Sequence, residues 1–278
     1  MSVRVRDVLL QRLTGLCHEP IDKWLRGKIG GHVVVDTTRA LLVWEPRRIV
    51  PSYAVPVDDV AADLTPVTTP AAAAPDGLLH PKIPFAAHSA DGVALTLVVA
   101  GMRREAAAFA PADPDLTGYV VLDFDAFDTW LEEDEPAFSH PRDPFHRIDI
   151  RRSSRHVRIE RGARVLADSS RPTLVFETGL PVRFYLPRDD VRVAMHASDR
   201  TTACPYKGAA VYWSFGDGDD IAWSYPSPLP DAAQLAGLVA FYDEVVDVTV
   251  DGVPRRRPDG AFSQVLRAEF GLDEMARH

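Results

Sequence analysis

The chain has 278 residues, of which 46% are hydrophobic and 26% are charged, and its formal net charge is −9. These values are typical of a globular protein, and the negative charge argues against a nucleic-acid binder that works by general phosphate neutralisation. Two cysteines exclude a disulfide framework and a four-cysteine zinc site, and they favour a reducing, cytoplasmic location.

The predicted elements begin with an amphipathic helix in residues 1–20, where charges interrupt the apolar residues as they do not in a signal peptide. No later apolar run is long enough for a membrane span, so no membrane partner is expected. Residues 21–130 hold short segments rich in β-branched and aromatic residues, separated by Pro and Gly, which predicts strands joined by turns. The clearest strands are 32–35, 41–44, 93–99 and 118–122. Residues 61–75 are expected to form a low-complexity loop.

The acidic, Pro-rich residues 131–150 are predicted to be a linker that contains no strand. Residues 151–252 return to the strand pattern, at 156–159, 174–176, 182–185, 209–213, 221–225 and 247–250. In the tail, residues 253–278, apolar side chains recur at helical spacing, so a closing helix is expected. The fold class is therefore mainly β, with two antiparallel domains and short terminal helices.

The two β-rich regions share motifs in the same order, which points to a tandem duplication. Asp36 to Glu45 (DTTRALLVWE) matches Asp168 to Glu177 (DSSRPTLVFE), with the same spacing between the two acidic residues. A Pro-x-Asp-Asp-Val phrase follows each, ending at Val60 and at Val191, and its aspartates predict one helical turn. A third match pairs residues 116–120 with 235–239.

The candidate chemistry lies in the second region, around residues 202–208 (TACPYKG). The Lys207 ammonium would favour the nucleophilic thiolate of Cys204, and His196 is a candidate base if the chain folds back onto Cys204. Thr202 belongs to the same motif. In the alternative reading, Cys204 is a small apolar side chain that only packs.

Two further groups of residues could bind a ligand. Strand alternation places Trp223 and Tyr225 on one face, where they could hold a planar molecule or simply form core. Glu177 precedes a turn that returns Arg183 and Tyr185 beside it, so a carboxylate facing a guanidinium could anchor a ligand or close the hairpin.

The second region resembles the bacterial family of unknown function numbered 427, over about residues 155 to 252. The resemblance rests on several motifs taken together: Asp168-Ser169, Glu177, Tyr185-x-Pro187-x-x-Asp190-Val191, Thr202-x-Cys204-Pro205-x-Lys207-Gly208, Trp223-x-Tyr225 and Phe241-Tyr242. In the first region His80-Pro81-Lys82 stands where the second has its cysteine motif, which implies a degenerate copy.

This resemblance implies β-tent-like domains, in which two antiparallel sheets meet at an angle. The family is sometimes labelled nucleotidyltransferase-like, but no paired-carboxylate metal site supports that activity here. β-tent relatives include cysteine-dependent methionine sulfoxide reductases and cereblon-type domains with a tryptophan cage. Both analogies lead to the region of Cys204 and Trp223, and they remain analogies of fold.

Three functions follow as hypotheses. The first is a small-metabolite enzyme that uses Cys204 and Lys207, with no cofactor or metal. The second is a small-molecule binding module, for a planar ligand such as a nucleoside or a cyclic imide, with Trp223 and Tyr225 as walls. The third is a protein-interaction scaffold that uses the arginine-rich strip at residues 151–164.

Overall fold

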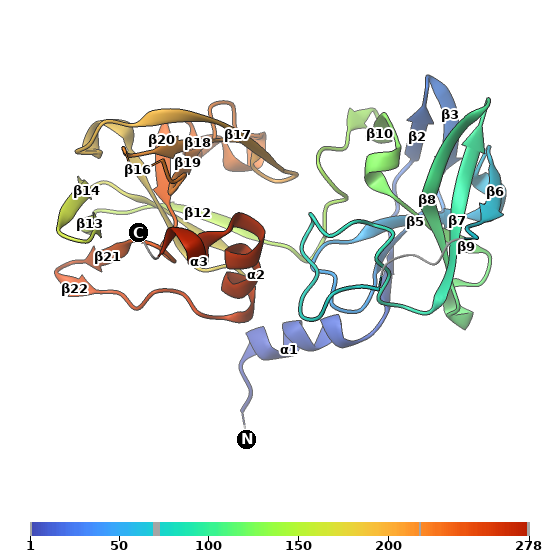
Figure 1. Cartoon of the computed structure of the whole chain (residues 1–278), viewed down its shortest axis with the longest axis horizontal. Coiled ribbons are helices and arrows are strands. Elements are labelled where there is room, and N and C mark those ends of the chain that lie inside the picture. Colours follow the sequence, from blue (N-terminus) through green and yellow to red (C-terminus); the bar gives the residue numbers. More distant parts are fainter. Residues whose placement is uncertain (1, 69–72, 217, 277–278) are drawn as a thin grey trace. The chain divides into compact units, whose positions relative to one another are not determined.

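The computed structural model of the chain describes residues 2–68, 73–216 and 218–276. The chain divides into two compact units, Met1–Asp143 and Pro144–His278. Each unit contains one seven-stranded and one four-stranded sheet, whose neighbouring strands pair antiparallel (Figure 1). The mainly β, antiparallel fold that the sequence predicts is therefore confirmed.

The first unit holds strands β1 to β11. Its seven-stranded sheet has the order β1 (Cys17–Pro20), β4 (Leu41–Trp44), β5 (Ser52–Pro56), β9 (Tyr119–Leu122), β8 (Met102–Pro111), β7 (Gly92–Val99) and β6 (Asp63–Pro66). Its four-stranded sheet has the order β11 (Glu135–Pro136), β10 (Thr129–Glu132), β2 (Leu25–Ile29) and β3 (His32–Thr37).

The second unit holds strands β12 to β22. Its seven-stranded sheet has the order β12 (Ile148–Arg152), β15 (Thr173–Glu177), β16 (Arg183–Pro187), β20 (Leu238–Phe241), β19 (Ala222–Ser224), β18 (Gly208–Ser214) and β17 (His196–Cys204). Its four-stranded sheet has the order β14 (Arg164–Ser169), β13 (Val157–Arg161), β21 (Asp247–Val250) and β22 (Val253–Pro254).

Helices are short and lie mainly at the two ends of the chain. They are α1 (Val5–Gln11), α2 (Ala261–Phe270) and α3 (Leu272–Met275), with short 3-10 segments η1 (Arg12–Thr14), η2 (Val57–Asp59), η3 (Pro114–Leu116), η4 (Phe124–Ala126), η5 (Arg188–Asp190) and η6 (Pro230–Leu235). The predicted closing helix and both Asp-Asp helical turns are confirmed. Among the described residues, no helix has the length and apolar character that a bilayer crossing requires.

Side-chain alternation explains why these segments become strands. In β2 the residues are alternately buried and part-exposed, and the buried ends are Leu25 and Ile29. β4 is buried throughout because it lies between β1 and β5, and both of its faces meet apolar residues. In the second unit one cluster of buried residues, from both sheets and from Leu272 of α3, forms the core.

The two units have the same strand order, so β1 to β11 occupy the positions that β12 to β22 occupy in the second unit. Asp36 pairs with Arg26 across β3 and β2, as Asp168 pairs with Arg158 across β14 and β13. Isolated bridges join Val35 to Val60 and Ala167 to Val191. Residues that match in sequence thus lie on equivalent strands.

Three predicted boundaries differ from the structure. The expected linker at residues 131–150 contains strands β10, β11 and β12, because its acidic run forms the turn of a hairpin that pairs with β2. The division between the units still falls within it, after Asp143. The segment assigned to an N-terminal helix ends in β1, which pairs with β4. The expected loop at 61–75 begins with β6, and residues 69–72 lie outside the described part of the chain.

A glycine in β2 supplies a test of the first unit's packing. A Cβ at Gly27 would lie 2.7 Å from the Trp130 ring and 2.9 Å from the Phe127 ring, both of which are buried. Gly27→Ala should therefore lower the free energy of unfolding by about 1–3 kcal/mol through overpacking. Urea denaturation measures the change.

Gly15→Ala is the matched control, because nothing lies within 4 Å of its Cβ position and its φ is −132°. It should change the free energy of unfolding by less than about 0.5 kcal/mol. Equal effects of the two variants would contradict this account of the packing.

Candidate functional site

The hairpin of β17 and β18 carries the candidate cysteine and lysine at its closed end. Cys204 is the last residue of β17 and lies opposite Gly208, the first residue of β18, so residues 205–207 form the turn. Gly208 has a φ of +101°, and a Cβ there would approach the Ser227 carbonyl oxygen to 3.2 Å. The turn therefore requires glycine at this position.

Cys204 lies on the side of β17 that turns toward the protein. Along the strand, Arg200, Thr202 and Cys204 are part-buried, whereas the residues between them are exposed. The Thr202 hydroxyl lies 2.9 Å from that of the buried Tyr212. Cys204 is thus partly accessible at the rim of the second unit's core.

A buried carboxylate lies at the centre of the site. Glu177, the last residue of β15, accepts a hydrogen bond from the Lys207 ammonium with one oxygen, and its other oxygen lies 2.9 Å from Nε2 of His146. The side chains of Glu177 and Lys207 are 7% and 9% exposed, and that of His146 is 19% exposed. The two sequence candidates form an ion pair, and His146 completes it.

Glu177 and Lys207 shift each other's pKa in opposite directions. Burial alone would raise the pKa of Glu177, but the Lys207 ammonium and the His146 hydrogen bond outweigh burial and lower it to about 2. Burial alone would lower the pKa of Lys207, but the Glu177 carboxylate, with smaller contributions from Cys204 and Tyr185, raises it. The carboxylate and the ammonium therefore both stay charged at neutral pH.

Two tyrosines complete the surroundings. Burial raises the pKa of Tyr185 well above its usual value, so its phenol stays protonated and accepts a hydrogen bond from Trp223 Nε1 at 3.0 Å. Burial also raises the pKa of Tyr225, as do the nearby Tyr185, Cys204 and Glu177. Tyr225 therefore lies within electrostatic range of both the thiol and the carboxylate.

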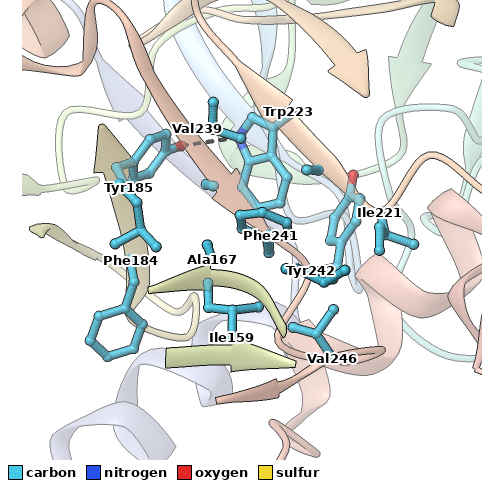
Figure 2. Packing of buried hydrophobic residues seen from close by; sticks show 14 of the residues in the cluster. Ile159, Ala167, Phe184, Tyr185, Ile221, Trp223, Val239, Phe241, Tyr242 and Val246 are labelled. Carbon is cyan, nitrogen blue, oxygen red and sulfur yellow. Dashed lines mark hydrogen bonds between the residues drawn. The ribbon is translucent and has the colours of Figure 1, made fainter. Parts of the chain in front are cut away.

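Trp223 and Tyr225 are 7% and 6% exposed and belong to the core of the second unit. Figure 2 shows Trp223 between Tyr185 and Tyr242, whose ring centroids lie 6.1 and 4.6 Å from that of Trp223. The Arg183 guanidinium lies 5.6 Å from the same ring. Because protein groups already surround the indole, this arrangement favours the packing interpretation of the aromatic pair.

The prediction that Arg183 faces Glu177 is wrong. Arg183 donates two hydrogen bonds of 2.8 Å to Glu244, and Asp243 lies 3.7 Å away, whereas Glu177 is occupied by Lys207 and His146. Glu244 follows β20, the strand next to β16, and offers both carboxylate oxygens to the guanidinium fork. Arg183 therefore ties β16 to the segment that follows β20.

The prediction that His196 could act as the base for Cys204 is also wrong. His196 and Cys204 lie at opposite ends of β17, opposite Ser214 and Gly208 of β18. Ser214 and Gly208 are six residues apart on β18, which corresponds to roughly 20 Å of strand, so His196 cannot accept the thiol proton. Sequence reasoning missed His146, which lies in the Pro-rich segment that was predicted to be a linker. No spacing signal links it to Glu177, and only the pairing of Ile148 with Glu177 brings it there.

The first unit has a different arrangement at the equivalent strand end. Glu45, directly after β4, accepts from His88 Nδ1 at 2.9 Å and from the backbone N–H groups of Ser89 and Ala90, and it lies 3.5 Å from Arg48 Nε. His80, the predicted counterpart, is not among these contacts. An open hollow of about 330 Å³ lies beside this loop, and its walls include Pro46, Ser89, Ala90 and Asp113.

The arginine-rich strip is largely neutralised within the second unit. Arg151 pairs with Asp149, Arg155 with Asp251, Arg158 with Glu160 and Asp168, and Arg161 with Asp219. Within the described parts of the chain, no group of three or more His, Cys, Asp or Glu side chains is arranged to hold a metal ion.

The buried ion pair predicts a large effect of removing one charge. Lys207→Met should destabilise the second unit by about 3–5 kcal/mol at pH 7, because it leaves the Glu177 carboxylate buried without its ammonium. Lys23→Met is the matched control, since Lys23 forms an ion pair with Glu132 but is 40% exposed, and it should cost no more than about 1 kcal/mol. Urea unfolding of both variants tests this, and equal losses would contradict it.

The same pair predicts a pH dependence. The pKa of Glu177 is lowered from 4.5 to about 2, so the stability it contributes is complete above pH 4.5 and is lost as the pH falls toward 2. The difference in stability between the wild type and Lys207→Met should therefore shrink over that window. A difference that stays constant between pH 6 and pH 3 would contradict this assignment.

Of the comparisons with known proteins, one matches a region of the chain. A search of curated proteins finds no match. The model of the family described as "Domain of unknown function (DUF427)" matches residues 149–252, a span that lies wholly in the second unit and includes Glu177, Cys204 and Lys207. Over residues 149–252, the second unit is thus similar to the family of unknown function numbered 427.

Proposed function

We propose that the second unit is an enzyme that acts on a small metabolite, with Cys204 as its nucleophile. The observation that carries this proposal is the position of a partly exposed thiol at the rim of the core, within electrostatic range of the buried Lys207 ammonium. An ammonium near a thiol favours the thiolate, which is the reactive form. The substrate then needs an electrophilic atom that carries a leaving group, and the bond to the leaving group breaks as the sulfur forms its bond.

The buried charges support a functional interpretation. Removing two ions from water costs several kcal/mol for each, and packing alone is served as well by apolar side chains. Strongly perturbed groups beside an accessible nucleophile are typical of active sites, although structural ion pairs also perturb pKa values. Cys17 offers a contrast, because its thiol donates to the carbonyl oxygen of Arg12 at 3.2 Å and has no cation in its described contacts.

The binding-module hypothesis has less support. It requires a ligand to lie against Trp223 or Tyr225, and both rings are enclosed by core residues. The scaffold hypothesis also has less support, because four arginines of the strip, at positions 151, 155, 158 and 161, pair with neighbouring carboxylates. We therefore favour the enzyme.

We also propose that the two units arose by duplication and that the first no longer carries this activity. The equal strand order and the matching motifs support the duplication. The first unit has no thiol in the loop that corresponds to residues 204–207, since its one cysteine, Cys17, lies in β1. Both cysteines are free, which agrees with a role in a reducing compartment such as the cytoplasm.

Reactivity of the thiol tests the proposal. In the full chain at pH 7, iodoacetamide should alkylate Cys204 at least about tenfold faster than Cys17, because a thiol without such help is only a few per cent thiolate at that pH. Mass spectrometry of the two cysteine-containing peptides measures both rates in one sample, with Cys17 as the internal reference.

Cys204→Ser gives the complementary control. It should fold with unchanged stability and lose the fast alkylation while the rate at Cys17 stays the same, since a hydroxyl is nearly isosteric with the thiol. If native Cys204 reacts no faster than Cys17, or reacts only after unfolding, the nucleophile proposal fails.

A further inference from the structure

The two ring nitrogens of His146 have different surroundings: Nε2 contacts Glu177, whereas Nδ1 has no partner among the described residues. Glu177 is ionised, with a pKa of about 2, and an ionised carboxylate can only accept hydrogen bonds. The 2.9 Å contact therefore requires that His146 Nε2 carries the proton. In the neutral ring Nδ1 then holds the lone pair. Nδ1 has no hydrogen-bond partner among the described residues, and it is not one of the solvent-inaccessible unpaired atoms.

The imidazole also packs against the turn that begins at Cys204. Its ring stacks on that of Tyr206, with centroids 4.5 Å apart and an interplanar angle of 25°. Tyr206 is two residues after Cys204 in the same tight turn, and the next residue, Lys207, shares the Glu177 carboxylate with His146. Tyr225 lies within range of both Cys204 and Glu177. One small region therefore contains the thiol, the imidazole and the carboxylate.

We infer that His146 is the general base of the Cys204 nucleophile and that Glu177 is the residue that positions it. This inference rests on the proposed function. The Cys204 proton moves to His146 Nδ1, directly or through one water molecule, which leaves a thiolate and an imidazolium. The sulfur electron pair then forms a bond to an electrophilic carbon of the substrate, while the bond from that carbon to its leaving group breaks and the leaving group takes that electron pair. The His146 imidazolium then gives its proton to the leaving group. Glu177 stabilises the imidazolium, which donates to it through Nε2–H, and Lys207 keeps the carboxylate charged.

The charged and titratable groups around the pair agree with this assignment. Those near His146 are Glu177 from β15, Lys207 and Tyr206 from the hairpin turn, and Arg147 and Asp149 along its own segment, where they pair with each other. Those near Cys204 are Lys207 and Tyr225. One carboxylate contacts the imidazole, and one ammonium lies near the sulfur.

Substitution of His146 tests the inference through the pH dependence of alkylation. In His146→Gln the amide can still donate a hydrogen bond to Glu177 but cannot accept the thiol proton. Iodoacetamide should alkylate Cys204 about tenfold more slowly than in the wild type at pH 7, because a thiol without a base is only a few per cent ionised there. The two rates should converge above about pH 9, where hydroxide removes the proton without help.

His196→Gln is the matched control. It removes the histidine at the far end of β17 and should leave the rate at Cys204 unchanged. Circular dichroism melting of each variant separates loss of the base from loss of the fold, and a merely structural role of His146 would not produce rates that recover at high pH.

The outcomes separate this inference from the proposed function. If Cys204 reacts fast in the wild type and equally fast in His146→Gln across the pH range, the base assignment is overturned while the nucleophile proposal stands. If Cys204 in the wild type reacts no faster than Cys17, the proposed function itself fails, and the inference fails with it.

Discussion

The buried ion pair of Glu177 and Lys207 is the interaction on which the second unit's site depends. Each charge alone would be expensive to remove from water, and close contact with the other must offset that cost. The pair therefore fixes the end of β15 against the turn between β17 and β18. His146 binds the other carboxylate oxygen, so the segment before β12 is fixed to the same place. Three segments distant in sequence are thus held together by one carboxylate.

The first unit shows that the strand framework alone does not create this arrangement. Glu45 occupies the equivalent strand end, but Arg48 and His88 surround it. The Arg48 guanidinium also donates to the carbonyl oxygens of Pro84, Phe85 and Ala87, so it orders the long loop before β7. With no thiol in that loop, the same buried carboxylate stabilises loop structure. In the second unit it contacts Lys207, which lies in the same turn as the partly exposed Cys204.

The C-terminal helices complete the second unit although they lie outside the family-matched residues. Phe262 of α2 packs against Gly179, in the turn that follows Glu177, where a Cβ would lie 2.7 Å from its ring. Phe270 packs 5.6 Å from Tyr242, and Leu272 of α3 is fully buried in the core. The tail therefore supports the turn and the aromatic cluster behind the site.

Much of the fold could be read from the sequence, because strand alternation and turn residues are local signals. Each predicted strand segment, from 32–35 to 247–250, overlaps a strand of the structure. Strands of mixed composition, such as β12 and β17, were missed because charged and small residues hide the alternation, and β10 and β11 were hidden by an acidic hairpin turn. For the site, the Cys204–Lys207 motif and Glu177 were both recognised, but they were not recognised as partners.

The sequence by itself determined the residue types that can carry chemistry and many of the strands, although not β17, which ends at Cys204. Only the tertiary structure decided their partners: Lys207 and His146 for Glu177, and Glu244 for Arg183. The physical reason is that a buried charge takes whichever opposite charge the strand order brings into contact, and strand order depends on pairings between segments far apart in the chain. As residue types in the sequence, His196 and His146 are equivalent. Strand register places one far from the thiol and the other against its turn.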